Sequence, residues 1–206
     1  MIGRTVIVLF LCYYWHIVLA SQCGKIHVNK LSAEEAKEIV DKHNELRRLI
    51  ATGKTPNQPR GVNLRKMKYD DRLAHEAQKI ADSCVFAHKK VLDSRWDNVG
   101  QNLFMSLSTD PSNGSSWKGA IQEWFDEHKN YKYKEVEKKD VGRKPDILHY
   151  TQVIWAENEY IGCGYTYFQT DEAFGFKKLY VCNYAQGNVV GQYPYKRGES
   201  GCENLC

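Results

Sequence analysis

The sequence predicts an α+β domain: a three-layer α-β-α sandwich in which helices cover both faces of a short, mainly antiparallel sheet. Segments with helical periodicity come first along the chain, and segments rich in aromatic and β-branched residues come later. The two kinds of segment do not alternate as they would in a parallel βαβ sheet. Six cysteines lie beyond residue 20, so we expect disulfides to brace this fold.

Residues 1–20 have the features of a secretory signal peptide. Arg4 gives a basic start, an apolar run follows, and Val18-Leu19-Ala20 supplies small residues for a signal peptidase. The run is interrupted by His16 and is short for a membrane span of ~20 residues, so a cleaved signal is favoured over an anchor. We therefore expect a secreted protein with no membrane span, formed by one domain over residues 21–206.

Three segments have the spacing of amphipathic helices. The first begins at a capping box, Ser32 with Glu35, and ends near Gly53. The second begins at Asp70 or Asp71, either of which can cap it. The apolar stripe of the first helix is formed by Ala36, Ile39, Val40, His43, Leu46 and Ile50. That of the second is formed by Leu73, Ala74, Ala77, Ile80, Ala81 and Cys84. That of the third is formed by Trp117, Ala120, Ile121, Trp124, Phe125 and His128.

The strands are predicted from residue type. The segments 160–168 and 176–184 are rich in aromatic and β-branched residues and flank a turn, so we expect an antiparallel hairpin. Residues 99–104 form a further candidate strand. Between this strand and the third helix, Asn113 begins the triplet Asn-Gly-Ser, an acceptor for N-glycosylation.

The charge balance argues against a nucleic-acid-binding protein. The formal net charge is +4, and acidic and basic residues are interleaved along most of the chain. The exception is the segment 132–144, which holds six Lys or Arg residues and three Asp or Glu residues. We interpret this segment as a solvated loop, with a phosphate or heparin patch as the alternative.

The cysteine count predicts three disulfides. Cys12 lies in the predicted signal, which leaves an even number in an oxidising compartment, with every pairing open on these grounds alone. No C-x-x-C spacing occurs, so a zinc ribbon is not expected.

Several segments are similar to those of one known family. The run 149–155, His-Tyr-Thr-Gln-Val-Ile-Trp, and the run 179–188, Leu-Tyr-Val-Cys-Asn-Tyr-Ala-Gln-Gly-Asn, resemble its two signature segments. The segments 43–47, 100–103 and 124–127 resemble its first-helix, central and third-helix motifs. The family is the CAP superfamily, which includes cysteine-rich secretory proteins, antigen 5 allergens and pathogenesis-related class 1 proteins.

Other residues refine the resemblance. Gln101 in place of the usual Glu, and the start at residues 22–25, resemble the antigen 5 branch of arthropod venom and saliva. Leu148 before the signature histidine, and the short segment after Tyr184, depart from the family pattern. Residues 21–206 then correspond to a single CAP domain, with a short tail that holds Cys202 and Cys206.

The resemblance implies a cleft and a disulfide pattern. The cleft is expected to bring together His88, Gln101, Glu127 and His149. In it, His88 and His149 would form a weak zinc site, and we do not expect the protein to require the metal. A polar pocket held by hydrogen bonds is the alternative. The implied disulfides are Cys23–Cys84 and Cys163–Cys182, and the second would also join the two predicted hairpin strands. Cys202–Cys206 then follows by elimination.

These expectations favour a binding protein over an enzyme. We expect a monomeric venom or salivary scaffold that binds a host protein or a small apolar ligand, such as a lipid or sterol. A groove bordered by Trp117, Trp124 and Phe125 would hold the ligand. The alternative is a weak metal-assisted hydrolase with His149 as base and Glu127 as its orienting residue. Neither G-x-S-x-G nor H-E-x-x-H occurs, so no enzymatic activity is expected.

Overall fold

The computed structural model describes residues 23–203 and 205–206, so the predicted signal peptide lies outside the described residues. Within that described part, no helix is long and apolar enough to cross a membrane. Its elements, in chain order, are β1 (Lys25–Val28), α1 (Ala33–Ala51), β2 (Lys68–Tyr69), α2 (Asp71–Ala81), β3 (Gly100–Ser108), α3 (Trp117–Asp126), the 3-10 helices η1 (Glu127–Asn130) and η2 (Lys138–Asp140), α4 (Leu148–Val153), β4 (Tyr160–Gln169) and β5 (Phe176–Tyr184).

The sheet is built around the predicted hairpin. β4 and β5 pair antiparallel with Cys163 opposite Cys182, and β3 pairs antiparallel with β5 along its whole length. The strand order is β1-β4-β5-β3, and β2 adds a short parallel pairing to β4. β3 is therefore an edge strand, and its outer edge is available to side chains from the loops and helices beside it.

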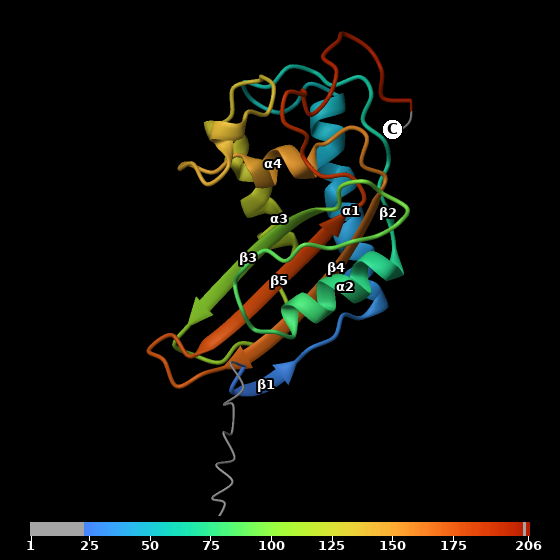
Figure 1. Cartoon of the computed structure of the whole chain (residues 1–206). Helices are drawn as coiled ribbons and strands as arrows, with labels where there is room; N and C mark the ends of the chain where they lie inside the picture. Colours follow the sequence, from blue (N-terminus) through green and yellow to red (C-terminus); the bar gives the residue numbers. More distant parts are fainter. Residues whose placement is uncertain (1–22, 204) are drawn as a thin grey trace, which may run out of the picture.

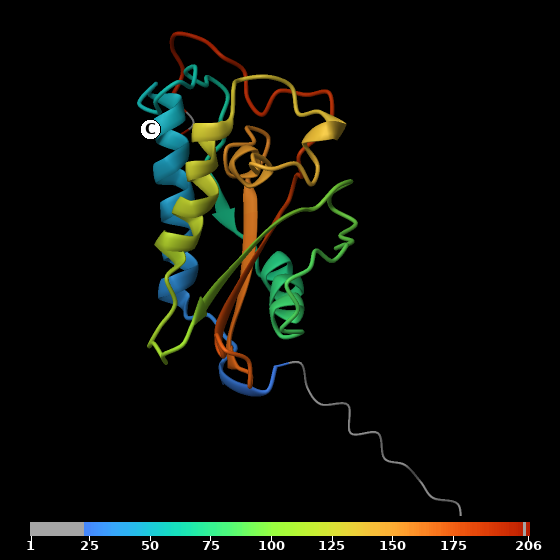
Figure 2. The ribbon, with the colours of Figure 1, turned by 90° about the vertical axis from the view of Figure 1, so that its left-hand side faces the viewer.

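Helices cover both faces of this sheet, as the sequence predicts (Figures 1 and 2). α2 lies on one face, and α1 and α3 lie side by side on the other, with α4 packed against α3. Each interface has its own buried cluster: a large one between the sheet and α1, α3 and α4, and a smaller one between the sheet and α2. The three-layer α-β-α prediction is confirmed.

The helix starts follow the predicted signals. Ser32 Oγ accepts the Glu35 N–H, and the Glu35 side chain accepts the Ser32 N–H, which completes the capping box of α1. Asp70, rather than Asp71, caps α2 by accepting the Leu73 N–H. These bonds satisfy donors that a helix leaves free in its first turn.

Among the described residues the structure contains three disulfides: the two pairs that the resemblance implies and the one left by elimination. Cys23 is joined to Cys84, Cys163 to Cys182, and Cys202 to Cys206. The first joins the segment before β1 to the end of α2, and the second links the neighbouring strands β4 and β5. The third closes a short loop near the C-terminus, where Leu205 is buried in the larger core.

Candidate functional site

A groove lies along the edge strand β3. It has a volume of about 360 Å³ and an apolar wall formed by Phe86, Leu103, Phe104, Met105 and Trp124. Phe86, after α2, is 55% exposed, whereas the Trp124 indole is buried and donates to the Leu103 carbonyl at the strand edge. Glu127, Asp146 and His149 line the same groove, so an apolar wall adjoins a polar one.

Glu127 fixes the position of His149. Its Oε2 accepts the backbone N–H groups of His149 and Tyr150, both at 3.1 Å, at the start of α4. Its Oε1 lies 2.6 Å from His149 Nδ1. Because a carboxylate only accepts hydrogen bonds, Nδ1 carries a proton and donates it to Glu127, and in the neutral form of the imidazole the lone pair is then on Nε2. The arrangement caps a short helix and orients an imidazole, two roles that one carboxylate performs together.

Asp146 is a site residue that sequence reasoning missed. One ligand atom each from Glu127, Asp146 and His149 lie within 4.8 Å of one another, the only such group among the described residues. The signal that could have found it is the position of Asp146, three residues before His149 and just ahead of the start of α4.

His88 and Gln101 form a separate pair. Gln101 Oε1 lies 3.0 Å from His88 Nδ1, and Gln101 Nε2 donates to Asn183 Oδ1 on β5. Asn183 in turn donates to the Leu73 carbonyl of α2, so this pair lies on the α2 side of the sheet. The next residue of β3, Asn102, points to the other face and donates to the His149 carbonyl. The structure therefore divides the four expected cleft residues into two pairs, and His88 does not join the group around His149.

The same contacts explain why residue 101 is glutamine. Its Nε2 donates both to Asn183 Oδ1 at 2.9 Å and to the Lys89 carbonyl at 3.2 Å. A glutamate would direct a second acceptor at these two oxygens and leave the contacts unfavourable. Gln101 is thus a structural link between β3, β5 and the loop that carries His88.

The predicted aromatic groove requires a correction. Trp117 is fully buried and Phe125 is only 3% exposed, and both belong to the core between α3 and the sheet. The helical periodicity of these residues marks the face of α3 that is buried in the core, not a ligand surface. Of the three predicted residues, Trp124 alone lines the groove. Asn113, the predicted glycosylation site, lies exposed in the loop between β3 and α3.

Comparison with known proteins identifies the family. The sequence model of the cysteine-rich secretory protein family, CAP, matches residues 40–184. The chain belongs to the CAP family. It is 33% identical over 203 residues to scoloptoxin SSD552 of Scolopendra dehaani, covering 95% of this chain and 91% of the relative. It is 33% identical over 183 residues to a salivary antigen-5 of Dipetalogaster maximus, covering 84% and 70%.

Two further comparisons bear on the extent of this CAP domain. A CRISP/Allergen/PR-1 protein of Trittame loki is 35% identical over 191 residues, which cover 88% of this chain but only 47% of that relative. The chain thus spans about half of its length. The solved structure of BmVAL-1 superposes with a TM-score of 0.69 at 26% identity, over 82% of this chain and 85% of that one. The sandwich of this chain is therefore a CAP fold.

Proposed function

We propose that this CAP protein is a secreted, non-enzymatic scaffold that binds a small, uncharged apolar molecule in the groove beside β3. The observation that carries the proposal is Phe86, an aromatic side chain that is 55% exposed at a concave site with an apolar wall. Exposed aromatic groups in a groove of this volume are typical of small-molecule sites. The names of the antigen-5 and scoloptoxin relatives, together with the disulfides, support secretion.

The polar wall selects the chemistry of the ligand. Glu123, Glu127 and Asp146 all line the groove, and Glu123 has no ion-pair partner among the described residues, so a carboxylate ligand such as a fatty acid would meet a like charge. A hydroxyl group instead donates to a carboxylate and gains a charge-assisted hydrogen bond. The groove therefore favours a neutral apolar molecule with one hydroxyl, as in a sterol.

The test is a titration of the purified protein with the fluorescent sterol dehydroergosterol, with oleate as the charged comparison. We expect saturable sterol binding and weaker oleate binding. Phe86→Ser should weaken sterol binding roughly tenfold, because the ring loses its apolar contact with the ligand. Phe174→Ser is the matched control, since Phe174 is 56% exposed in the β4–β5 turn, away from the groove. Equal effects of the two variants, or tighter binding of oleate, would reject the proposal.

Two further arms of this experiment address zinc and catalysis. The apolar wall supplies the affinity, so sterol binding should persist when EDTA removes divalent ions. Any weak zinc site would be formed at His149 and Asp146 rather than at His88, in view of the ligand atoms grouped around His149. The hydrolase alternative requires peptide cleavage by the wild type that is lost in Glu127→Gln. Such cleavage would replace the binding proposal.

A further inference from the structure

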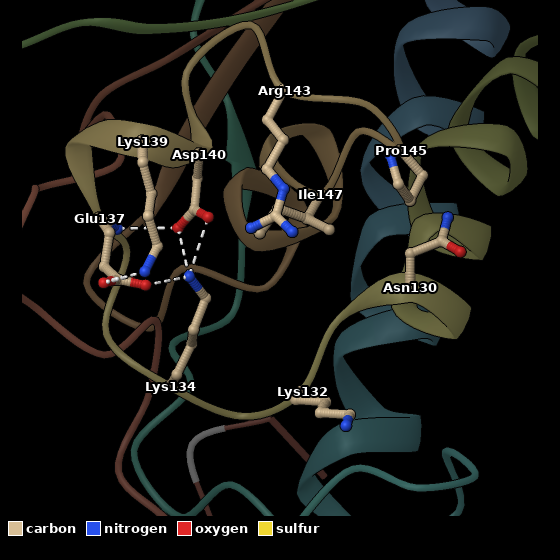
Figure 3. A pocket seen from close by; sticks show the side chains of 9 residues that line it. All are labelled: Asn130, Lys132, Lys134, Glu137, Lys139, Asp140, Arg143, Pro145 and Ile147. Carbon is tan, nitrogen blue, oxygen red and sulfur yellow. Dashed lines mark hydrogen bonds and ion pairs between the residues drawn. The ribbon is translucent and has the colours of Figure 1, made fainter.

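The basic segment 132–144 forms part of a pocket and is not only a solvated loop. It carries an excess of three positive charges, against a formal net charge of +4 for the whole chain. This segment folds around a pocket with a volume of about 390 Å³. Figure 3 shows the side chains that line it. The pocket lies next to the groove beside β3, and Asn130 lines both.

The acidic residues that line this pocket, Glu137 and Asp140, are paired with lysines of the same segment. Lys134 Nζ donates to both oxygens of Asp140, at 2.8 and 2.7 Å, and also pairs with Glu137. Lys139 Nζ lies 2.9 Å from the second oxygen of Glu137. Hydrogen bonds from Lys134, and then from Lys139, lower the pKa of Glu137 to about 2. This network is internally balanced: two carboxylates meet two ammonium groups.

Two cations that line the pocket lie outside that network. In the part of the chain that the structure describes, neither Lys132 nor Arg143 forms an ion pair. Figure 3 shows the Arg143 guanidinium directed into the pocket, between the ion-pair network and Lys132. The guanidinium fork matches the oxygens of a sulfate or phosphate ester, and an ammonium adds a second positive charge.

We propose that this pocket is an anchor point for a sulfated polysaccharide. Two exposed cations hold a single anion only weakly, because water and salt screen the charges. A chain of repeated sulfates also reaches the exposed Lys138 beside the pocket and releases counterions along its length. No aromatic ring lines the pocket on which a nucleic-acid base could stack, whereas sulfated sugars need none. The inference does not depend on the sterol proposal.

The test compares matched double variants on immobilised heparin. Lys132→Gln/Arg143→Gln removes the two unpaired cations of the pocket. Lys25→Gln/Lys30→Gln removes two exposed lysines on and just after β1, at the opposite end of the sheet (Figure 1). We expect the pocket variant to lose roughly tenfold in affinity and to show a shallower salt dependence. The β1 variant should stay within about twofold of wild type, because its charges lie away from the site.

Two controls keep the proposal falsifiable if a variant folds poorly. Lys132→Arg/Arg143→Lys keeps both charges and should retain most of the affinity. In the wild type, bound heparin should protect Lys132 from acetylation, as read by mass spectrometry, and leave Lys25 reactive. Equal losses in the two Gln variants, equal binding of desulfated heparin, or a preference for anionic vesicles or duplex DNA would overturn the proposal.

Discussion

The buried polar residues of α1 show what single side chains contribute. Arg47 is fully buried and donates to the backbone carbonyls of Arg65, Val153, Trp155, Ala156 and Asn158. It thereby supplies hydrogen bonds to backbone carbonyl groups in the chain that leaves α4 and in the loop before β2, two segments with few regular hydrogen bonds of their own. Burial lowers the pKa of Arg47 to about 9, so it remains charged at neutral pH.

His43, one helical turn before Arg47, is also fully buried. Its Nδ1 lies 2.8 Å from the Ile39 carbonyl and its Nε2 lies 2.9 Å from the Tyr184 hydroxyl. Both ring nitrogens thus have partners inside the core, and His43 holds α1 to β5. This is a structural histidine rather than a ligand.

His43 should make stability depend on pH. Burial lowers its pKa from 6.5 to about 4, so between these values the unfolded chain binds more protons than the folded one. The free energy of unfolding should therefore fall as pH decreases from about 6.5 to about 4, by on the order of 3 kcal/mol. Urea unfolding at pH 7 and pH 4.5 measures this loss.

His43→Gln should reduce that pH dependence, because glutamine gains no proton. His75→Gln is the matched control, since His75 lies exposed on α2. It should keep the full pH dependence. If His43→Gln and wild type lose the same free energy between the two pH values, the acid sensitivity arises elsewhere.

At the scale of elements, the sequence predicts the helices and strands in which residue types follow a clear pattern. α1, α2, α3 and the β4–β5 hairpin were all predicted, and residues 99–104 mark the first half of β3. β1, β2 and α4 were not predicted. β1 is exposed on every residue and β2 has only two residues, so neither has an apolar alternation to detect. α4 has six residues and depends on Glu127, a side chain from another element, for its first turn.

The site was predicted unevenly for a related reason. His149 and Glu127 could be named from their local motifs, but the partner of each residue depends on which face of β3 it meets. Gln101 and Asn102 are neighbours in sequence and yet contact opposite layers. Trp117 and Phe125 are buried in the core and do not line the groove. Helical periodicity alone does not distinguish these two positions.

Gly162 of β4 is required for the close packing of α2. A Cβ at this position would lie 2.1 Å from the Ala74 nitrogen and 2.4 Å from the Asp70 carbonyl oxygen, both backbone atoms. Gly162→Ala should therefore displace α2 and cost about 3 kcal/mol of unfolding free energy. Urea unfolding measures the loss, and hydrogen exchange should show weaker protection in α2.

Gly119 provides the contrast. It lies exposed in α3, and a Cβ there meets only the Ser116 hydroxyl, which can rotate away. Gly119→Ala should be neutral or stabilise the protein by up to about 1 kcal/mol, because alanine favours a helix. Equal destabilisation by the two alanines would show that α2 adjusts to the added methyl group.

At the scale of the whole molecule, the sheet has to hold two separate cores together. The larger core involves α1, α3 and α4, whereas α2 packs on the other face with a smaller cluster. Cys23 and Cys84 belong to that smaller cluster. Their disulfide ties the beginning of the described chain to the end of α2, where the apolar area available to hold the helix is limited.

The Cys23–Cys84 disulfide should consequently stabilise the fold more than Cys202–Cys206. The first joins residues 61 apart and the second joins residues 4 apart. In the chain-entropy picture these loops correspond to about 4 and about 2 kcal/mol of unfolding free energy. Replacing Cys23 and Cys84 by alanine also removes buried sulfur atoms from the α2 core, whereas the Cys202 and Cys206 side chains are less buried. Urea unfolding of the two double-alanine variants tests the order. An equal or larger loss for the Cys202–Cys206 variant would mean that docking of the C-terminal segment, rather than closure of the long loop, limits the stability of the sandwich.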